Sequence, residues 1–294
     1  MSARRVAALD IGGTRMKSCL FDGGVPVRRG ETDTQARQGG AHVMARAISA
    51  LEALGEFDAV GVSTAGQVDP DSGTIRYANE NIPGYTGTDV RGILSARFGV
   101  GVAVVNDVYA AALGEGVCGG GRGESDYLCL TYGTGIGGGV VLGGRPYYGA
   151  GPSAGVMLGG IVTHPEQLSG ADPFAGTYER SASATALVAM ARAVDPALES
   201  GRAIFSRLGE SAVKAVVDRW LDEVAAGVCT LIHAYNVPCV LLGGGVMEQP
   251  YAIEGTRARV EASIIPGFRG VRVRAAELGN MAGLYGALSL AEQL

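Results

Sequence analysis

One pattern occurs twice in the 294 residues and constrains the fold more than any other feature: an apolar strand, a turn of glycine and threonine, and a second strand. In the first copy the turn is Asp-Ile-Gly-Gly-Thr at 10–14, between expected strands at 5–9 and 16–21. In the second copy the turn lies at 132–139, between expected strands at 127–131 and 140–142. Two such hairpins predict two related halves, and the glycine cluster at 119–123 is their expected boundary.

The other periodic segments predict an α/β fold with a mixed sheet, because strands alternate with helices of crossover length. In the first half we expect further strands at 25–31, 59–63 and 102–105 and helices at 41–54 and 89–98. In the second half we expect helices at 178–194, 201–208, 211–235 and 251–265 and strands at 239–242 and 271–274. A final helix at 281–292 can return to pack on the first half. The predicted domains are therefore a small N-terminal α/β domain, 1–118, joined by the C-terminal helix 281–294, and a larger α/β domain, 119–280.

Glycine is the compositional outlier, with 48 residues, about twice its usual share. Three glycine-rich turns, at Gly12, Gly133 and Gly243, each follow an apolar strand. Glycine lets successive backbone N–H groups converge on phosphate oxygens, and the hydroxyls of Thr14 and Thr134 add donors. The three turns together indicate phosphate binding.

Other phosphate-binding and nucleotide-binding classes do not match. The segment 133–138 has the Gly-x-Gly-x-x-Gly spacing of dinucleotide-binding proteins, but it runs into an expected strand, and no acidic residue lies between Asp126 and Glu166. The chain has no Gly-x-x-x-x-Gly-Lys-Ser/Thr loop and neither His-Arg-Asp nor Asp-Phe-Gly of protein kinases. Phosphate binding on hairpins, with a separate carboxylate, is the class that remains.

Asn106 and Asp107 supply a candidate carboxylate, at the corner between the expected strand 102–105 and an alanine-rich helix. In open α/β folds, ligands bind at the carboxyl ends of strands. Asp107 at such a corner can accept a proton from a substrate hydroxyl. The alternative is that Asp107 only caps the helix. The irregular segment 74–88 is expected to be a functional loop.

The net charge and the cysteine pattern limit which partners and which cellular compartment we expect. A net charge of −5, with no long basic cluster, argues against nucleic acid. We see no signal peptide and no membrane-spanning window, and therefore expect a cytoplasmic protein that does not bind membranes. The five cysteines and three histidines are dispersed, so no structural zinc site is expected.

Four motifs, in this order, resemble those of the ROK family of sugar kinases, within the actin–hexokinase superfamily. They are Asp-Ile-Gly-Gly-Thr at 10–14, Asn-Asp followed by Ala-Ala-Ala-Leu-Gly-Glu at 106–115, Gly-Thr-Gly-Ile-Gly-Gly-Gly at 133–139, and Gly-Gly-Gly-Val at 243–246. The resemblance covers nearly the whole chain. It implies a duplicated ribonuclease H-like fold in two domains with the active site in the cleft between them. It also implies a homodimeric kinase of the glucokinase, N-acetylmannosamine kinase or β-glucoside kinase type.

The resemblance further implies transfer of the γ-phosphoryl group of ATP, with Mg²⁺, to a hexose hydroxyl, at carbon 6. By position, Asp107 matches the catalytic base, and the implied sugar contacts are Gly66, Asn81, Asn106, Asp107 and Glu179. The implied ATP contacts are Asp10, Gly12, Gly13, Thr14, Lys17, Gly133, Thr134, Gly135, Gly244 and Gly245, with Asp10 acting on Mg²⁺ through water. On their residue types alone, Glu179 can merely favour a helix start, Asn81 make a turn, and Lys17 face solvent.

One stretch departs from the family pattern. The family carries Glu-x-Gly-His after the second hairpin, and a cysteine cluster that binds zinc with that histidine. The corresponding stretch here, 154–160, has neither Glu nor His, and the cysteines are absent. The departure leaves the identity of the sugar open. It also leaves open a catalytically weak sugar-binding regulator, without the DNA-binding domain of ROK repressors. A phosphotransferase acting on a carboxylate or polyphosphate is a further alternative.

Overall fold

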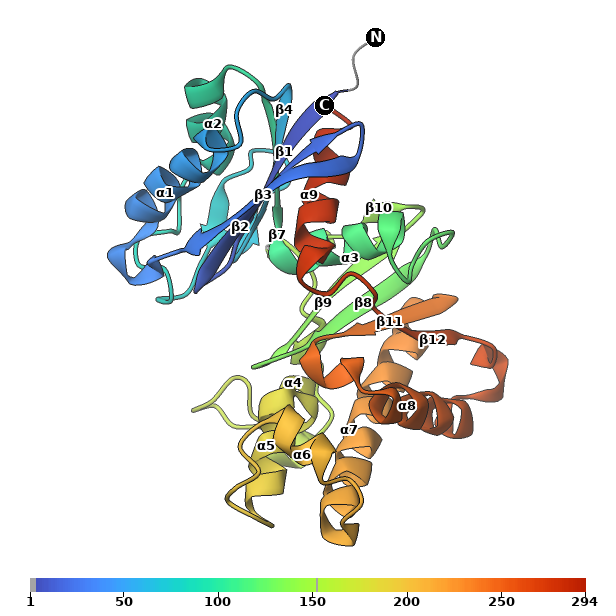
Figure 1. Cartoon of the computed structure of the whole chain (residues 1–294). Helices are drawn as coiled ribbons and strands as arrows, with labels where there is room; N and C mark the ends of the chain where they lie inside the picture. The colour runs from blue at the N-terminus through green and yellow to red at the C-terminus, as the bar shows by residue number, and fades with distance from the viewer. Residues whose placement is uncertain (1–3, 152) are drawn as a thin grey trace. The chain divides into compact units, whose positions relative to one another are not determined.

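The computed structural model describes residues 4–151 and 153–294. Contacts divide the chain into two compact units (Figure 1). The first unit comprises Met1–Arg122, Pro146–Val156 and Asn280–Leu294, and the second comprises Gly123–Arg145 and Met157–Gly279. The domain boundaries given above stay a prediction, and each unit is described by itself.

The first unit is built on a five-stranded sheet of order β3-β2-β1-β4-β7. β1 is antiparallel to β2 and parallel to β4, which is parallel to β7. The strands are β1 (Arg5–Ile11), β2 (Arg15–Asp22), β3 (Val25–Asp33), β4 (Ala59–Thr64) and β7 (Gly101–Asn106), with a separate pair β5 (Gln67–Val68) and β6 (Ile75–Tyr77). The helices are η1 (Ala36–Gln38), α1 (Gly40–Glu52), α2 (Val90–Phe98), α3 (Asp107–Cys118) and α9 (Ala282–Ala291), which follows η6 (Gly279–Met281).

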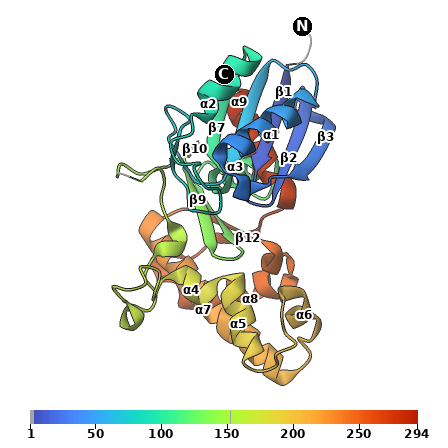
Figure 2. The ribbon, with the colours of Figure 1, turned by 90° about the vertical axis from the view of Figure 1, so that its left-hand side faces the viewer.

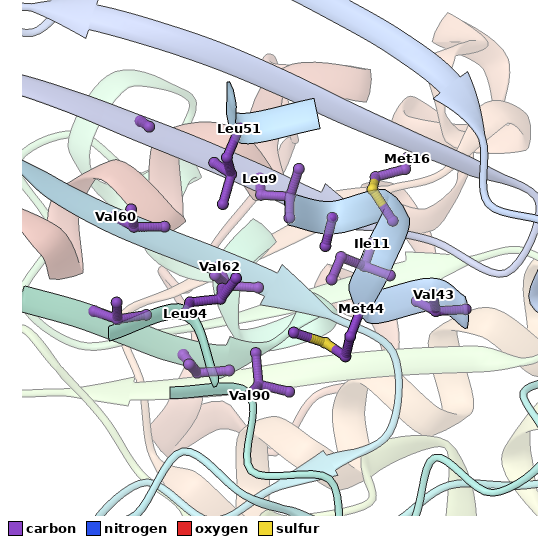
Figure 3. Close-up of a cluster of buried hydrophobic side chains, with 14 of the residues drawn as sticks. Leu9, Ile11, Met16, Val43, Met44, Leu51, Val60, Val62, Val90 and Leu94 are labelled. Atoms are coloured by element: carbon purple, nitrogen blue, oxygen red, sulfur yellow. The ribbon is translucent and has the colours of Figure 1, made fainter. Parts of the chain in front are cut away.

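Both faces of this sheet are covered, as the apolar strands β1 and β4 require. On one face, the buried side chains of α1 and α2 pack on Leu9, Ile11 and Val62 (Figure 3). On the other face, α9 packs on Val6 and Ala8 through its own apolar residues. The expected return of the last helix to the first half is confirmed.

Glycines bring α9 into backbone contact with its neighbours. Gly61 lies on β4, Gly114 on α3 and Gly286 on α9. A Cβ atom at any of them would overlap the backbone carbonyl of an alanine: Ala287, Ala282 and Ala110, respectively. α9 is therefore fixed at a separation that only glycine permits at these crossings.

The second unit has a five-stranded sheet of order β10-β9-β8-β11-β12, the same sequential order as the first. Its strands are β8 (Tyr127–Tyr132), β9 (Ile136–Leu142), β10 (Arg145–Pro146), β11 (Cys239–Gly243) and β12 (Arg272–Ala275). Its helices are η2 (Leu158–Gly160), η3 (Pro165–Gln167), α4 (Tyr178–Ala182), α5 (Ala184–Arg192), α6 (Gly201–Ser206), α7 (Ser211–Tyr235), η4 (Gly245–Glu248), α8 (Pro250–Ser263) and η5 (Pro266–Phe268). The α/β class and the duplication predicted from the two hairpins are confirmed.

Helices α4, α5 and α8 pack against the long helix α7 (Figure 2). Among residues 4–151 and 153–294, no helix combines the length and the apolarity needed to cross a membrane.

Two local expectations are wrong. The segment 178–194 is not one helix, because Ser183 adopts an extended conformation and its Oγ atom caps α5 by accepting a hydrogen bond from Ala186 N at 3.2 Å. The segment 74–88 is not wholly irregular, because Ile75–Tyr77 pairs with Gln67–Val68. Side-chain capping in the first case and a non-local pairing in the second override the local pattern.

Candidate active site

The first of the glycine turns predicted to bind phosphate connects β1 to β2 in the first unit. Gly12 N donates to Arg15 O at 3.1 Å, which closes the turn. Thr34, after β3, braces it: its Oγ1 donates to Gly12 O at 2.7 Å and its N donates to Thr14 O at 2.9 Å. A Cβ atom on Gly13 would meet nothing within 4 Å, so the backbone there is open to close approach by a ligand.

Asp10, at the end of β1, is held by a residue that sequence reasoning missed. Ser63 Oγ donates to Asp10 Oδ1 at 2.7 Å. Burial raises the pKa of Asp10, while this hydrogen bond and the nearby Lys17 act to lower it. Ser63 could have been found from register, because it is the partner of Asp10 in the parallel pair β1 and β4.

Lys17 lies on β2 opposite Asp10. Its Nζ atom donates to Asn280 Oδ1 at 3.1 Å, before the start of α9. The structure thus places Lys17 beside the first turn. Its expected contact with phosphate stays a prediction.

Asn106 and Asp107 have different roles at the start of α3. Asn106 is the N-cap, and its Oδ1 atom accepts from Val108 N at 3.0 Å and from Tyr109 N at 3.4 Å. Its Nδ2 atom donates to Asp107 Oδ1 at 2.8 Å and to Gly66 O at 2.8 Å. Because Asn106 supplies the cap, helix capping does not by itself account for Asp107.

Burial, together with the negative charge of Asp10, raises the pKa of Asp107 to about 6, against hydrogen bonds from Val108 N and Asn106 that lower it. A carboxylate poised near neutral pH is suited to accept a proton from a hydroxyl. The shift arises because the start of α3 places the carboxylate in a desolvated corner.

Gly66 and Asn81 complete the predicted set in the first unit. Gly66 has φ 95°, and a Cβ atom there would lie 2.9 Å from Tyr77 O. Its carbonyl is the acceptor that orients Asn106. Asn81 is exposed, and it lines a hollow that Gly13 and Thr14 also line.

The second hairpin, between β8 and β9, brings Gly133, Gly135 and Glu179 together. Gly133 N donates to Gly135 O at 3.0 Å. Glu179 Oε2 accepts from Ile136 N at 3.4 Å, and a Cβ atom on Gly135 would lie 2.6 Å from the same carboxylate oxygen. Thr134 is exposed at the tip of the turn. The carboxylate of Glu179 therefore lies directly against the second glycine turn that was predicted to bind phosphate.

The aromatic residue next to Glu179 anchors it. Tyr178 is fully buried, and its hydroxyl lies 2.6 Å from the Tyr132 hydroxyl and donates to Val224 O at 2.8 Å. Gly227 on α7 leaves room for the Tyr178 ring. This contact fixes the start of α4 beneath β8.

The third glycine turn, after β11, borders a hollow of about 390 Å³ within the second unit. Gly244 has φ 98°, and a Cβ atom there would overlap Tyr132 O, so only glycine fits. The hollow is lined by Tyr132, Gly133, Ala184, Gly201, Arg202, Phe205, Gly245, Val246, Glu248 and Gln249. Its volume and its mixed polar and apolar walls fit a nucleoside. Apart from Gly133 and Gly245, sequence reasoning singled out none of these residues as a ligand contact.

An ion pair ties the segment that contains His164 to the long helix α7. His164 Nε2 lies 2.8 Å from Glu223 Oε2 on α7, and His164 Nδ1 lies 3.0 Å from Glu166 Oε1. The hydrogen bond to Glu223 is the main cause that raises the pKa of His164; Glu166 raises it too, against partial burial. Over the described ranges 4–151 and 153–294, no group of three or more His, Cys, Asp or Glu side chains is placed to hold a metal.

We expect Glu223→Gln to destabilise the protein at acid pH and to have little effect at alkaline pH. A raised histidine pKa contributes stability that is fully present below the unfolded pKa, near 6.5, and is lost as pH rises through the folded pKa. The expected loss in unfolding free energy is about 1 kcal/mol at pH 5.5, because both side chains are partly exposed. Urea unfolding at pH 5.5 and 8.5 measures it, and Glu166→Gln, at the more exposed partner of His164, should show a smaller loss with the same pH dependence. An equal loss at both pH values would contradict the charge-pair explanation.

Comparison with known proteins agrees with the paired sheets and glycine turns. The family model described as "ROK family" matches residues 6–294. A glucokinase of Thermotoga maritima is 30% identical over 315 residues, covering 100% of this chain and 99% of that protein. A crystal structure of a ROK hexokinase from Thermus thermophilus is 32% identical, with a TM-score of 0.82 over 98% of both chains. A ROK family glucokinase from Streptomyces griseus, in complex with glucose and AMPPNP, is 26% identical, with a TM-score of 0.81 over 99% of this chain and 100% of that one. A match of this extent establishes the duplicated actin/hexokinase-like fold, and the chain belongs to the ROK family.

Proposed function

We propose that this protein is an ATP-dependent sugar kinase that transfers the γ-phosphoryl group of Mg-ATP to a hexose hydroxyl, at O6. The observation that carries the proposal is the half-buried carboxylate of Asp107, which accepts a hydrogen bond from Asn106 and whose pKa is raised to about 6. The similarity to glucokinases and to a hexokinase supports a phosphotransferase with an alcohol acceptor.

In the proposed reaction, the sugar hydroxyl oxygen attacks the γ-phosphorus as its proton passes to Asp107. The new O–P bond forms, and the bond from the γ-phosphorus to the oxygen that leaves with ADP breaks. Asn106, oriented by the carbonyl of Gly66, holds both the carboxylate and a sugar hydroxyl. Asn81 and Glu179 hold further hydroxyls. Orientation of the nucleophile is the main contribution of these groups, because the transition state of phosphoryl transfer is loose.

The donor is bound through the glycine turns. Gly12, Gly13 and Thr14 in the first unit and Gly133, Thr134 and Gly135 in the second offer backbone and hydroxyl donors to phosphate oxygens. Gly244 and Gly245 lie against the adenosine. Asp10 would hold Mg²⁺ through water, and Lys17 would add positive charge. When bound, the ion would neutralise phosphate charge.

The rate should fall at acid pH with a midpoint near the Asp107 pKa. The base acts only when ionised, so we expect kcat/KM to decline below about pH 6 and to lose close to tenfold for each further pH unit. A pH profile of ADP release, with the coupling enzymes in excess, measures this. A profile that stays flat down to pH 4.5 would show that Asp107 is not the titrating base.

A catalytically weak sugar-binding regulator is the second candidate. The observation that favours it lies in the stretch 154–160, which contains neither a carboxylate nor an imidazole, while Met157 is 58% exposed there. Such a stretch offers no charged acceptor to sugar hydroxyls. Under this alternative the protein binds a sugar tightly without turning it over.

The test is ADP release from Mg-ATP with purified protein across glucose, mannose, N-acetylmannosamine, N-acetylglucosamine, fructose, allose and β-glucosides. Sugar-dependent turnover supports the kinase and identifies its acceptor. A sugar that raises the melting temperature without being turned over supports the regulator. Replacing ATP by polyphosphate in the same assay tests the donor.

We also propose that the protein is a homodimer in the cytoplasm and that it does not bind nucleic acid. Sedimentation in the same buffer tests the homodimer.

A further inference from the structure

Three residues at the end of β4 are placed to hold different parts of the proposed site. Ser63 Oγ donates to Asp10 Oδ1 at 2.7 Å. Gly66 O accepts from Asn106 Nδ2 at 2.8 Å. Thr64 lies between them, is fully buried, and is the register partner of Asn106 in the parallel pair β4 and β7. The reaction as described gives the Thr64 side chain no role.

The Thr64 hydroxyl contacts a tyrosine from the loop that carries Asn81. Thr64 Oγ1 lies 2.8 Å from the hydroxyl oxygen of Tyr85, and both residues are 0% exposed. A buried hydroxyl costs free energy unless it is hydrogen-bonded, so each of the two hydroxyls stabilises the position of the other. The Tyr85 phenol thereby joins the loop to the end of β4.

Tyr85 and Ile82 anchor this loop in the core of the first unit. Asn81, next to Ile82, is exposed. The loop is closed between Ala78 and Thr86, because Thr86 Oγ1 accepts from Ala78 N at 3.0 Å. Asn81 therefore lies on a short closed loop, and its location follows from where the side chains of Ile82 and Tyr85 are anchored.

The segment before α1 holds the same loop through its backbone. Gln35 has a left-handed backbone, with a φ of 52°, and leads the chain into η1. Two residues further on, Arg37 Nη1 donates to Glu80 O at 3.3 Å. The loop is thus attached to this segment by backbone and to β4 by Tyr85. Loss of the Tyr85 hydroxyl should loosen the loop toward β4 without detaching it from the first unit.

We infer that Tyr85 is a positioning residue for the acceptor sugar, because through Thr64 it sets the location of Asn81 relative to Asn106. The inference rests on the proposed function, in which both amides bind hydroxyls of one sugar. Two ligands of one sugar bind it best when their separation is fixed beforehand, because less ordering entropy is then lost on binding. Tyr85 itself is fully buried, so it acts through Asn81 and does not touch the sugar.

The test measures KM and kcat in wild type, Tyr85→Phe and Thr64→Val, with glucose or with whichever sugar of the panel above is turned over fastest. Each variant closely keeps the shape of its side chain and removes one hydroxyl. We expect KM for the sugar to rise about fivefold in either variant, with kcat and KM for Mg-ATP changed less than about twofold. The melting temperatures should fall by about 3 °C.

A double-mutant cycle separates positioning from a general loss of packing. If Tyr85 acts through Asn81, Tyr85→Phe should change KM for the sugar by less than about twofold in an Asn81→Ala background. The fall in melting temperature should be the same in both backgrounds. Tyr251→Phe is the matched control, because its hydroxyl donates to Asp218 Oδ1 at 2.6 Å within the second unit, and it should leave both KM values unchanged.

Two results would overturn the inference. The first is a KM for the sugar that stays within about twofold of wild type in Tyr85→Phe while the melting temperature falls, which would make the hydroxyl pair purely structural. The second is an equal rise in that KM in both backgrounds, which would show that Tyr85 does not act through Asn81. Turnover of no sugar by wild type would instead contradict the proposed kinase. In that case the Kd from calorimetric titration with the sugar that raises the melting temperature replaces KM in the cycle, and the same two results decide.

Discussion

Replacing Asp107 by Asn should lower kcat for sugar phosphorylation by about 10³-fold, within the range expected for loss of a general base. The amide keeps an oxygen that can accept from Asn106 Nδ2 and Val108 N, so the start of α3 is preserved while the proton acceptor is lost. KM for the sugar should change by only a few fold, because Asn106 stays in place. ADP release at saturating Mg-ATP measures both constants.

The same variant should be more stable than wild type at neutral pH, which separates lost chemistry from lost folding. A carboxyl pKa raised to about 6 in the folded state contributes stability that is present below pH 3.8 and is lost as pH rises through 6. Above pH 7 the ionised Asp107 therefore costs up to about 3 kcal/mol, at about 1.4 kcal/mol for each unit of pKa shift. We expect Asp107→Asn to melt higher than wild type at pH 7.5 and to show no such gain near pH 4. Retention of activity within tenfold, or a lower melting temperature at pH 7.5, would contradict this role.

Replacing Gly286 by Ala should destabilise the protein by about 3 kcal/mol, the upper end of the cost of overpacking. A Cβ atom at this position would overlap the carbonyl of Ala110, which is backbone and cannot rotate away. α9 would have to move from α3 and from the sheet that it covers. Urea unfolding followed by circular dichroism measures the change in unfolding free energy.

Gly209→Ala is the control for this prediction. A Cβ atom on Gly209 would meet nothing within 4 Å, and its backbone is not left-handed. Its unfolding free energy should stay within about 0.5 kcal/mol of wild type. If Gly286→Ala were as mild as this control, the close crossing of α9 and α3 would not be the source of stability argued here.

The elements of this fold follow largely from local pattern. Both glycine hairpins, the long helix Ser211–Tyr235 and the buried strand Ala59–Thr64 were predicted to within a few residues, because their apolar periodicity is strong. The break at Ser183 was not predicted, because a serine inside an alanine-rich run is compatible with a helix unless another segment of the same chain competes for the backbone hydrogen bonds. Here Ala184 N donates to Gly133 O instead of continuing the helix.

The candidate site was only partly predictable for a similar reason. Glycine turns and Asp107 are visible as short motifs, whereas Ser63 matters only through its register with Asp10 on a strand far away in sequence. The left-handed backbone of Gln35 leaves no trace in residue type, since turn chemistry would favour glycine or asparagine. Both depend on tertiary contacts.

The position of α9 also sets an order of events during synthesis. A ribosome makes strands β1 and β4 and helix α3 early, but residues 282–291, which cover them, are made only after every strand and helix of the second unit. Until then Val6 and Ala8 expose an apolar surface, and Asp10 lacks the cover of Gly283, which packs against its carboxylate. The second unit is translated in full during that interval. The first unit therefore cannot close its sheet until residues 282–291 have been made, and its proposed phosphate-binding corner matures only then.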